Sequence, residues 1–328
     1  FALCLPREEF DEKRVADSIK ELQREFSGNS FHLHTYMGVY EIRDRDEAVS
    51  IMVDKANIAA DTIKNNYDCC VAYYDEHLLE ISIEQRRLLG EFEPALQKDE
   101  FVMYLQPQVN RDGVAKGAEA LVRWAHPSRG ILTPYAFIDI LENAGLIYKL
   151  DLYIWEKAAQ KLAEWKEKGY GSYHISVNIS TKDFYIIDIY ETFTGLINKY
   201  GIAASDLHLE ITEKTLMTDF EKNMNIIHKL QDVGFRMEID DFGSGYSSLN
   251  MLKDISADVL KIDMGFLRKS ENEVKGQDIL ESIITLAGKI GMDVITEGVE
   301  TKKQLDMLTM MGCHEFQGYY FSKPVPVS

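Results

Sequence analysis

Eight β-rich segments alternate with helical stretches over the last two thirds of this 328-residue chain. Strands joined by helical crossovers over about 230 residues have the size of a (β/α)8 barrel. We therefore predict an α/β fold, a TIM-like barrel that occupies residues 99–328. The expected strands are 101–109, 115–124, 173–179, 207–212, 236–240, 258–263, 292–296 and 315–321, and the expected helices include 134–143, 152–168, 220–233 and 279–290.

A short link joins the first two expected strands. A parallel crossover needs about a dozen residues or more, whereas a tight turn is enough for an antiparallel pair. Residues 110–114, with the sequence NRDGV, are too few for a helical crossover. We therefore predict that the first strand of the barrel runs antiparallel to the second.

The first 74 residues have a different pattern. Here we expect a strand at 1–6, a helix at 8–26, a strand at 31–42 and a helix at 48–64. Two strands and two helices cannot easily close a core, so residues 1–74 are interpreted as part of an α+β domain. Residues 75–98 are predicted to form a connecting helix. Because the chain begins with phenylalanine, we expect it to be a piece of a longer protein.

Composition argues against several classes of function. The formal net charge of −18 disfavours binding of a nucleic-acid polymer, but not of a small phosphate ligand where metal ions intervene. No apolar run approaches the roughly 18 residues of a membrane-spanning helix, so we expect no direct membrane insertion. Cys4, Cys69, Cys70 and Cys313 lack metal-ligand spacing, and we interpret them as reduced thiols of a cytoplasmic chain.

Polar and ionisable residues stand at the C-terminal ends of the expected strands, where the active site of a (β/α)8 barrel lies. For one such acid, a structural salt bridge is the commoner explanation. Here seven strands in succession end in a polar or ionisable residue, which argues against that explanation, because so many acids at one rim require neutralising charge. The residues are Glu119, Asn178, Glu210, Asp240 with Asp241, Lys261, Glu297 and Gln317.

Divalent cations are the simplest source of that charge. Two carboxylates about 4 Å apart repel by roughly 4 kcal/mol at an effective dielectric near 20. Carboxylate and amide ligands without histidine or cysteine suit Mg²⁺ or Mn²⁺. The adjacent Asp240 and Asp241 can serve two ions, an arrangement used for in-line displacement at phosphorus, and Lys261 can hold the attacking water. The residues therefore predict metal-assisted phosphoester hydrolysis, with other metal-dependent barrel chemistry as the alternative.

These residues lie in strings that resemble the EAL phosphodiesterase family. The resemblance covers about residues 100–328, and the ordered set is far more specific than any single motif. It implies hydrolysis of cyclic di-GMP to linear pGpG in bacterial second-messenger signalling. The matching strings are QP (106–107), EALVRW (119–124), VNIS (177–180), LEITE (209–213), DDFGSGYSSL (240–249), LKID (260–263), EGVE (297–300) and QGYYFSKP (317–324).

The resemblance also implies a role for each matching residue. It implies one Mg²⁺ or Mn²⁺ ion on Glu119, Asn178, Glu210 and Asp240, and a second on Asp240, Asp241 and Glu297. Lys261 is implied to act on the catalytic water, with Glu119 and Glu297 beside it, and the nucleotide contacts are implied to be Gln106, Leu121, Arg123 and Gln317. The loop 241–248 resembles a mobile loop that helps to form the metal site and a homodimer contact, and Glu213 resembles the glutamate that steadies it.

Glu238 departs from the family pattern. It lies two residues before Asp240, so the period of a strand directs it into the barrel, where the family usually has a small residue. A buried extra acid requires a partner or a proton. We expect a lysine or a water beneath the site to be that partner.

Residues 1–74 resemble the C-terminal half of a GGDEF diguanylate cyclase domain. The string FALCLP resembles the segment that follows the signature turn, and KANIAADTIKNN (55–66) is an altered version of a later helix. The turn itself and the nucleotide-binding half lie outside this chain. We therefore expect no cyclase activity from it.

Two alternatives to the enzyme stay open. The first is a receptor that binds cyclic di-GMP without cutting it and signals through a partner domain. The second is an interaction scaffold that binds no nucleotide. The intact acids and Lys261 favour the enzyme, and the presence of Gln106, Arg123 and Gln317 counts against the scaffold.

Overall fold

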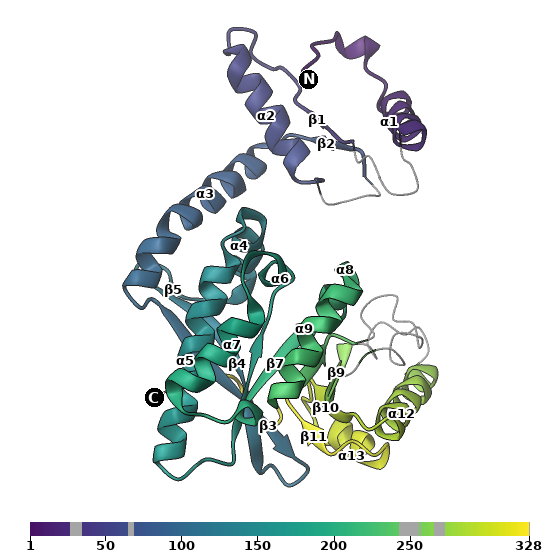
Figure 1. The fold of residues 1–328 in the computed structure, drawn as a ribbon. Helices are drawn as coiled ribbons and strands as arrows, with labels where there is room; N and C mark the ends of the chain where they lie inside the picture. Colours follow the sequence, from purple (N-terminus) through teal and green to yellow (C-terminus); the bar gives the residue numbers. More distant parts are fainter. Residues whose placement is uncertain (27–34, 65–68, 243–254, 256, 266–272, 328) are drawn as a thin grey trace. The chain divides into compact units, whose positions relative to one another are not determined.

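A computed structural model describes residues 1–26, 35–64, 69–242, 255, 257–265 and 273–327 (Figure 1). The chain divides into two compact units, Phe1–Glu91 and Phe92–Ser328. The division falls within helix α3 (Glu76–Gln97), which corresponds to the expected connecting helix.

Before α3, the described residues of the N-terminal unit form two helices and a small parallel sheet. The helices are α1 (Glu12–Phe26) and α2 (Val49–Asp61), preceded by a 3-10 turn at Arg7–Glu9, and the strands are β1 (Met37–Val39) and β2 (Val71–Tyr73). Helix α2 packs so closely on β1 that a Cβ atom at Gly38 would collide with the backbone of Ala56. Both helices confirm the sequence-based expectation.

The strands of this unit differ from the expectation. The predicted strand at 1–6 is wrong: these residues are exposed and form no strand, because no described strand lies beside them to complete the hydrogen bonds. Of the predicted strand at 31–42 only Met37–Val39 is a strand, and residues 31–34 lie outside the described part of the chain. Strand β2 was not predicted, since three residues carry too little periodicity.

The C-terminal unit is a closed barrel of eight strands (Figure 1). Strand β3 is antiparallel to both neighbours, β4 and β11, while the other neighbours are parallel. The predicted barrel and its antiparallel first strand are therefore confirmed. In ring order the strands are β3 (Phe101–Asn110), β4 (Ala115–His126), β6 (His174–Asn178), β7 (Leu207–Thr212), β8 (Met237–Asp240), β9 (Val259–Asp263), β10 (Asp293–Glu297) and β11 (Glu315–Phe316).

The last strand is shorter than expected. Strand β11 ends at Phe316, and the chain turns over residues 318–321 instead of continuing as a strand. At the turn Gly318 lies against the backbone of Val299, which leaves no room for a Cβ atom. Two short strands extend the sheet outside the ring, namely β5 (Gly130–Leu132) beside β4 and β12 (Val325–Pro326) beside β3.

Helices surround the strands of the barrel, as Figure 1 shows. The longest, α5, buries Leu150, Ile154 and Ala158, which recur every fourth residue and so form one apolar face. Among the described residues, no helix has the length and apolar character needed to cross a bilayer. The helices are α4 (Ile138–Ala144), α5 (Ile147–Glu167), α6 (Asp183–Ile186), α7 (Ile189–Tyr200), α8 (Glu213–Thr218), α9 (Phe220–Val233), α12 (Glu273–Lys289) and α13 (Lys302–Met310), with 3-10 turns at Pro134–Ala136 and Ala204–Asp206.

Strand β7 shows how the barrel combines an apolar layer with a polar interior. Leu207, Leu209 and Ile211 alternate along it and are buried in the layer between strand and helices. His208 and Glu210 lie on the opposite face, inside the barrel, and are also buried. One strand thus contributes both to the core and to the interior site.

Hydrogen bonds from a helix and between neighbouring strand ends hold the barrel rim in place. The indole Nε1 of the fully buried Trp155 donates to the carbonyl oxygen of Asn178 at 2.9 Å. The amide of Ile179 donates to the carbonyl oxygen of Glu210 at 2.8 Å, and that of Met264 to the carbonyl oxygen of Glu297 at 3.1 Å. The side chains at these strand ends therefore project from a rigid frame.

Replacing Leu209 by alanine should lower the free energy of unfolding by about 2–5 kcal/mol, because the side chain is fully buried and its removal leaves a cavity. Urea unfolding followed by circular dichroism measures the change. The control Tyr135→Ala, at a residue that is 97% exposed, should leave the unfolding midpoint almost unchanged. Equal midpoints for the two variants would contradict the assignment of Leu209 to the core.

Candidate active site

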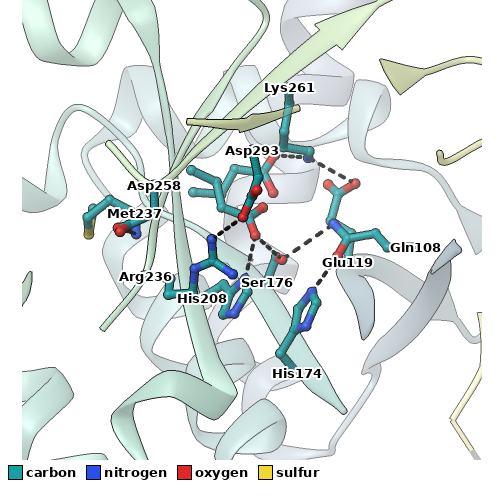
Figure 2. Close-up of polar contacts among 12 residues, drawn as sticks. Gln108, Glu119, His174, Ser176, His208, Arg236, Met237, Asp258, Lys261 and Asp293 are labelled. Atoms are coloured by element: carbon teal, nitrogen blue, oxygen red, sulfur yellow. Dashed lines mark hydrogen bonds and ion pairs between the residues drawn. The ribbon is translucent and has the colours of Figure 1, made fainter. Parts of the chain in front are cut away.

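The ammonium group of Lys261 lies at the centre of four carboxylates. Its Nζ atom is 2.5 Å from Glu210 Oε1, 2.6 Å from Glu297 Oε1, 3.4 Å from Glu119 Oε2 and 3.8 Å from Asp240 Oδ1. The four acids come from β4, β7, β8 and β10, and the lysine from β9. Figure 2 shows the lysine directed toward Glu119. The structure therefore brings together five residues that lie far apart in the sequence.

Negative charge exceeds positive charge in this cluster, since four carboxylates face one ammonium group. Burial raises the pKa of Glu297 to about 8 and raises the pKa of Glu210 well above its usual value, with the charge of Glu119 adding to the effect at Glu210. Burial alone would lower the pKa of Lys261, but the surrounding acids, Glu119 first among them, raise it well above the usual value. The lysine is therefore charged, and the acids retain an excess of negative charge or bound protons.

The donor set of the cluster fits a hard divalent cation. Glu119, Glu210 and Glu297 each offer one carboxylate oxygen, and these oxygens lie within 4.8 Å of one another. Glu210 Oε2 is buried and has no hydrogen-bond partner among the described residues. The amide of Asn178 approaches the same group, with Nδ2 3.2 Å from Glu119 Oε1. Carboxylate and amide oxygens of this kind are the ligands of Mg²⁺ and Mn²⁺.

Asp241 extends the acidic cluster beyond β8. It has a φ of 56°, a left-handed conformation that costs a non-glycine residue about 1–2 kcal/mol and that occurs at functional sites. Its pKa is raised, first by burial and then by the charges of Asp240 and Asp263. Burial and repulsion by neighbouring acids thus both disfavour the ionised form of this carboxylate, and a bound cation would offset both effects.

Asp263 was not singled out from the sequence. It is the last residue of β9, and its Oδ1 atom accepts a hydrogen bond from the amide of Gly265 at 2.7 Å. Its carboxylate also lies beside Gly298, directly after the strand that ends in Glu297. The signal was available, because Asp263 closes the LKID string at a strand end, where the other acids were found.

The residues expected to contact a nucleotide adjoin Glu119 along the first two strands. Gln106 lies opposite Glu119 in the antiparallel pairing of β3 and β4. Leu121 and Arg123 follow Glu119 at two-residue intervals and so share its face of β4. The Arg123 guanidinium lies 5.5 Å from the ring centre of Tyr104.

Gln317 joins the cluster from the segment that follows β11. Its Nε2 atom donates to Glu119 Oε2 at 2.5 Å, and its Oε1 atom is buried without a hydrogen-bond partner in the described part of the chain. Glu213 begins α8 directly after β7. Most of the expected loop at 241–248, including Gly243 and Gly245, lies outside the described residues.

Glu238 lies inside the barrel, as its position two residues before Asp240 predicted, and is fully buried. Its partners are His208, whose Nδ1 is 2.6 Å from Glu238 Oε1, and Ser176, whose hydroxyl donates to the same oxygen at 3.0 Å. The expected lysine is not among these partners, which are an imidazole and a hydroxyl. His208 was missed, although it lies two residues before Glu210 and therefore on the same face of β7.

The fold and the site define a class of protein, a TIM-like barrel with an acid-rich site at the C-terminal ends of its strands. The family described as the EAL domain matches residues 90–324 of this chain. The chain therefore belongs to the EAL domain family.

Two curated relatives and one solved structure illustrate the similarity. MucR of Pseudomonas aeruginosa, named a bifunctional diguanylate cyclase/cyclic di-GMP phosphodiesterase, is 32% identical over 269 residues, which are 82% of this chain and 39% of MucR. PdeR of Escherichia coli, named a cyclic di-GMP phosphodiesterase, is 32% identical over 232 residues, 71% of this chain and 35% of PdeR. The structure described as the PaMucR phosphodiesterase in complex with c-di-GMP has a TM-score of 0.70 at 33% identity and covers 74% of this chain and 98% of that one. This chain thus spans less than half the length of the two curated relatives.

The raised pKa of Glu297 predicts how stability depends on pH without metal. Between the ordinary pKa of 4.5 and the folded-state value of about 8, the folded chain binds more protons than the unfolded chain, so stability should fall as pH rises through this window. Urea unfolding in chelator across this range measures the slope. Glu297→Gln, which cannot ionise, should flatten it. An unchanged slope would show that Glu297 has no raised pKa.

Proposed function

We propose that this chain hydrolyses cyclic di-GMP to linear pGpG with the help of two Mg²⁺ or Mn²⁺ ions. The observation that carries the proposal is the group of four carboxylates around the buried Lys261 at the C-terminal ends of the strands. Such a group has excess negative charge and is suited to cations that act on a phosphodiester. The names of MucR and PdeR, which are cyclic di-GMP phosphodiesterases, support this substrate.

The proposed ligands divide between two ions that share Asp240. Glu119, Asn178, Glu210 and Asp240 are proposed for the first ion, and Asp240, Asp241 and Glu297 for the second. Bound ions would lower the pKa of a shared water and neutralise the oxygens of the scissile phosphate. The close approach of Asn178 to Glu119 and the unpartnered oxygen of Glu210 support this ligand set.

The protein's own residues supply the remaining chemistry. Lys261 is proposed to hold the attacking water and to stabilise negative charge as it develops on the phosphate, since its ammonium group is buried in a region of low dielectric. Arg123 is proposed to pair with a phosphate through its planar guanidinium group. Gln106, Leu121 and Gln317 are proposed to position the nucleotide, and Glu213 to steady the loop at 241–248.

Two further proposals concern the chain as a whole. Residues 1–74 are proposed to be the C-terminal half of a GGDEF domain, a proposal supported by the name of MucR, a bifunctional diguanylate cyclase/cyclic di-GMP phosphodiesterase. The EAL domain is proposed to form a homodimer in the cytoplasm. Analytical ultracentrifugation tests the dimer, and a monomer at all concentrations would contradict it.

Replacing Lys261 by methionine should lower kcat by about 10²–10³-fold, because the positive charge at the reacting phosphate is lost. Formation of pGpG, followed by chromatography with Mg²⁺ or Mn²⁺, measures the change. The matched control is Lys302→Met, at an exposed lysine paired with Asp306 on α13, which should retain the activity. Unchanged turnover in a folded Lys261→Met protein would remove Lys261 from the mechanism.

Calcium separates binding from hydrolysis. Ca²⁺ is larger and takes looser geometries, so it should support binding of cyclic di-GMP without turnover. Under these conditions Arg123→Lys should raise the Kd by about tenfold, because a lysine cannot pair with phosphate in a bidentate manner. Calorimetry measures the Kd, with Arg236→Lys, directly before β8, as the matched control. Tight binding by the wild type without turnover in Mg²⁺ or Mn²⁺ would instead identify a non-hydrolysing receptor.

A further inference from the structure

A second polar cluster lies inside the barrel, nearer to the N-terminal ends of the strands than the acids around Lys261. It consists of His174 on β6, His208 on β7 and Glu238 on β8. Each of the three side chains offers one ligand atom, and these atoms lie within 4.8 Å of one another. Figure 2 shows the two imidazoles on one side of Ser176 and the lysine on the other.

The cluster is built and supported by its surroundings. The two imidazole rings stack, with centroids 3.8 Å apart and planes within 5° of parallel. His174 Nε2 lies 2.7 Å from the side-chain oxygen of Gln108, which is fully buried. The His174 ring occupies the space that a side chain at position 117 would take, so Gly117 is required for it.

The charge state of the cluster is that of a ligand set. Burial lowers the pKa of His174 to about 3, so its ring is neutral and carries a free lone pair. Glu238 uses only one of its two carboxylate oxygens for the contacts with His208 and Ser176, since both lie at Oε1, at 2.6 Å and 3.0 Å. Glu238 Oε2 is fully buried and accepts no hydrogen bond from any described residue. A buried anionic oxygen without a partner is costly, and it points to a ligand.

We propose that His174, His208 and Glu238 bind a transition-metal ion of the Zn²⁺ type, at a site separate from the carboxylate cluster around Lys261. Two imidazole nitrogens and one carboxylate oxygen, completed by water, form a ligand set that suits zinc. Gln108 is placed to orient the His174 ring through its second nitrogen, as an outer carboxamide does in metal sites. The cluster of acids around Lys261 contains no histidine and would therefore prefer hard ions. The cluster of His174, His208 and Glu238 would prefer zinc-like ions.

Binding requires one imidazole to turn out of the stack, because a metal ion lies in the plane of each ring that binds it. His174 is the more exposed of the two rings and is therefore the one proposed to turn. It is the first residue of β6 and is partly exposed, whereas His208 is 3% exposed.

Cobalt is a suitable probe, since four-coordinate Co²⁺ with imidazole ligands absorbs visible light much more strongly than six-coordinate Co²⁺ held by oxygen. The full chain is titrated with Co²⁺ in excess Mg²⁺, which occupies the hard-ion site. The expected result is an intense visible band that saturates at one equivalent and disappears when Zn²⁺ is added. His174→Gln and His208→Gln should each abolish the band, and Gln108→Ala should weaken Co²⁺ affinity by about 10–100-fold.

The control Glu119→Gln alters the carboxylate cluster and should keep the band at full intensity. Absence of the band in the wild-type chain would overturn the proposal and leave the cluster as a hydrogen-bonded network. Loss of the band in Glu119→Gln together with its retention in His174→Gln would also overturn it, by assigning the ion to the carboxylate cluster. Circular dichroism checks that each variant folds, and the partly exposed His174 gives an informative variant even if His208→Gln unfolds.

Discussion

The contact between the buried ammonium group of Lys261 and four carboxylates is the constraint on which the rest of this structure depends. A barrel interior has low polarity, so the acids can lie there only because the lysine offsets part of their charge. One ammonium group cannot offset four carboxylates, and the pKa values of Glu210 and Glu297 are raised, first by burial and then by the charges of neighbouring acids. The acids around Lys261 therefore retain an excess of negative charge or bound protons, which suits the binding of cations.

The barrel supplies the rigidity that this imbalance requires. Repelling groups would separate if their backbones could move, but each comes from a strand that is hydrogen-bonded on both sides and covered by helices. Trp155 adds a bond to the carbonyl of Asn178 at the rim. The apolar faces of the strands, such as Leu207 and Leu209 on β7, provide burial that offsets the cost of the charged interior.

The interior has two polar levels, because a strand directs every second residue inward. The level at the strand ends contains carboxylates, such as Glu210 and Asp240, which are proposed as metal ligands. The level below contains His208 and Glu238, each two residues earlier on the same strand. Register decides which of them meet: Glu238 pairs with Glu210 across β7 and β8, and its carboxylate still reaches the imidazole of His208. Glu238, which departs from the family pattern, is thereby joined to His208, an imidazole in an interior that also holds many acids.

The sequence by itself determined the eight strands of the barrel, the antiparallel first pair and the acids at the strand ends, because periodicity, link length and strand-end position are local properties. It did not determine which strands complete a sheet, so the strand expected at residues 1–6 was wrong and β2 was missed. Only the tertiary structure decided that Lys261 contacts four acids at once and that Glu238 meets His208 and Ser176. These contacts join residues from different strands, and their distances follow from barrel closure and register, which no single segment of the chain encodes.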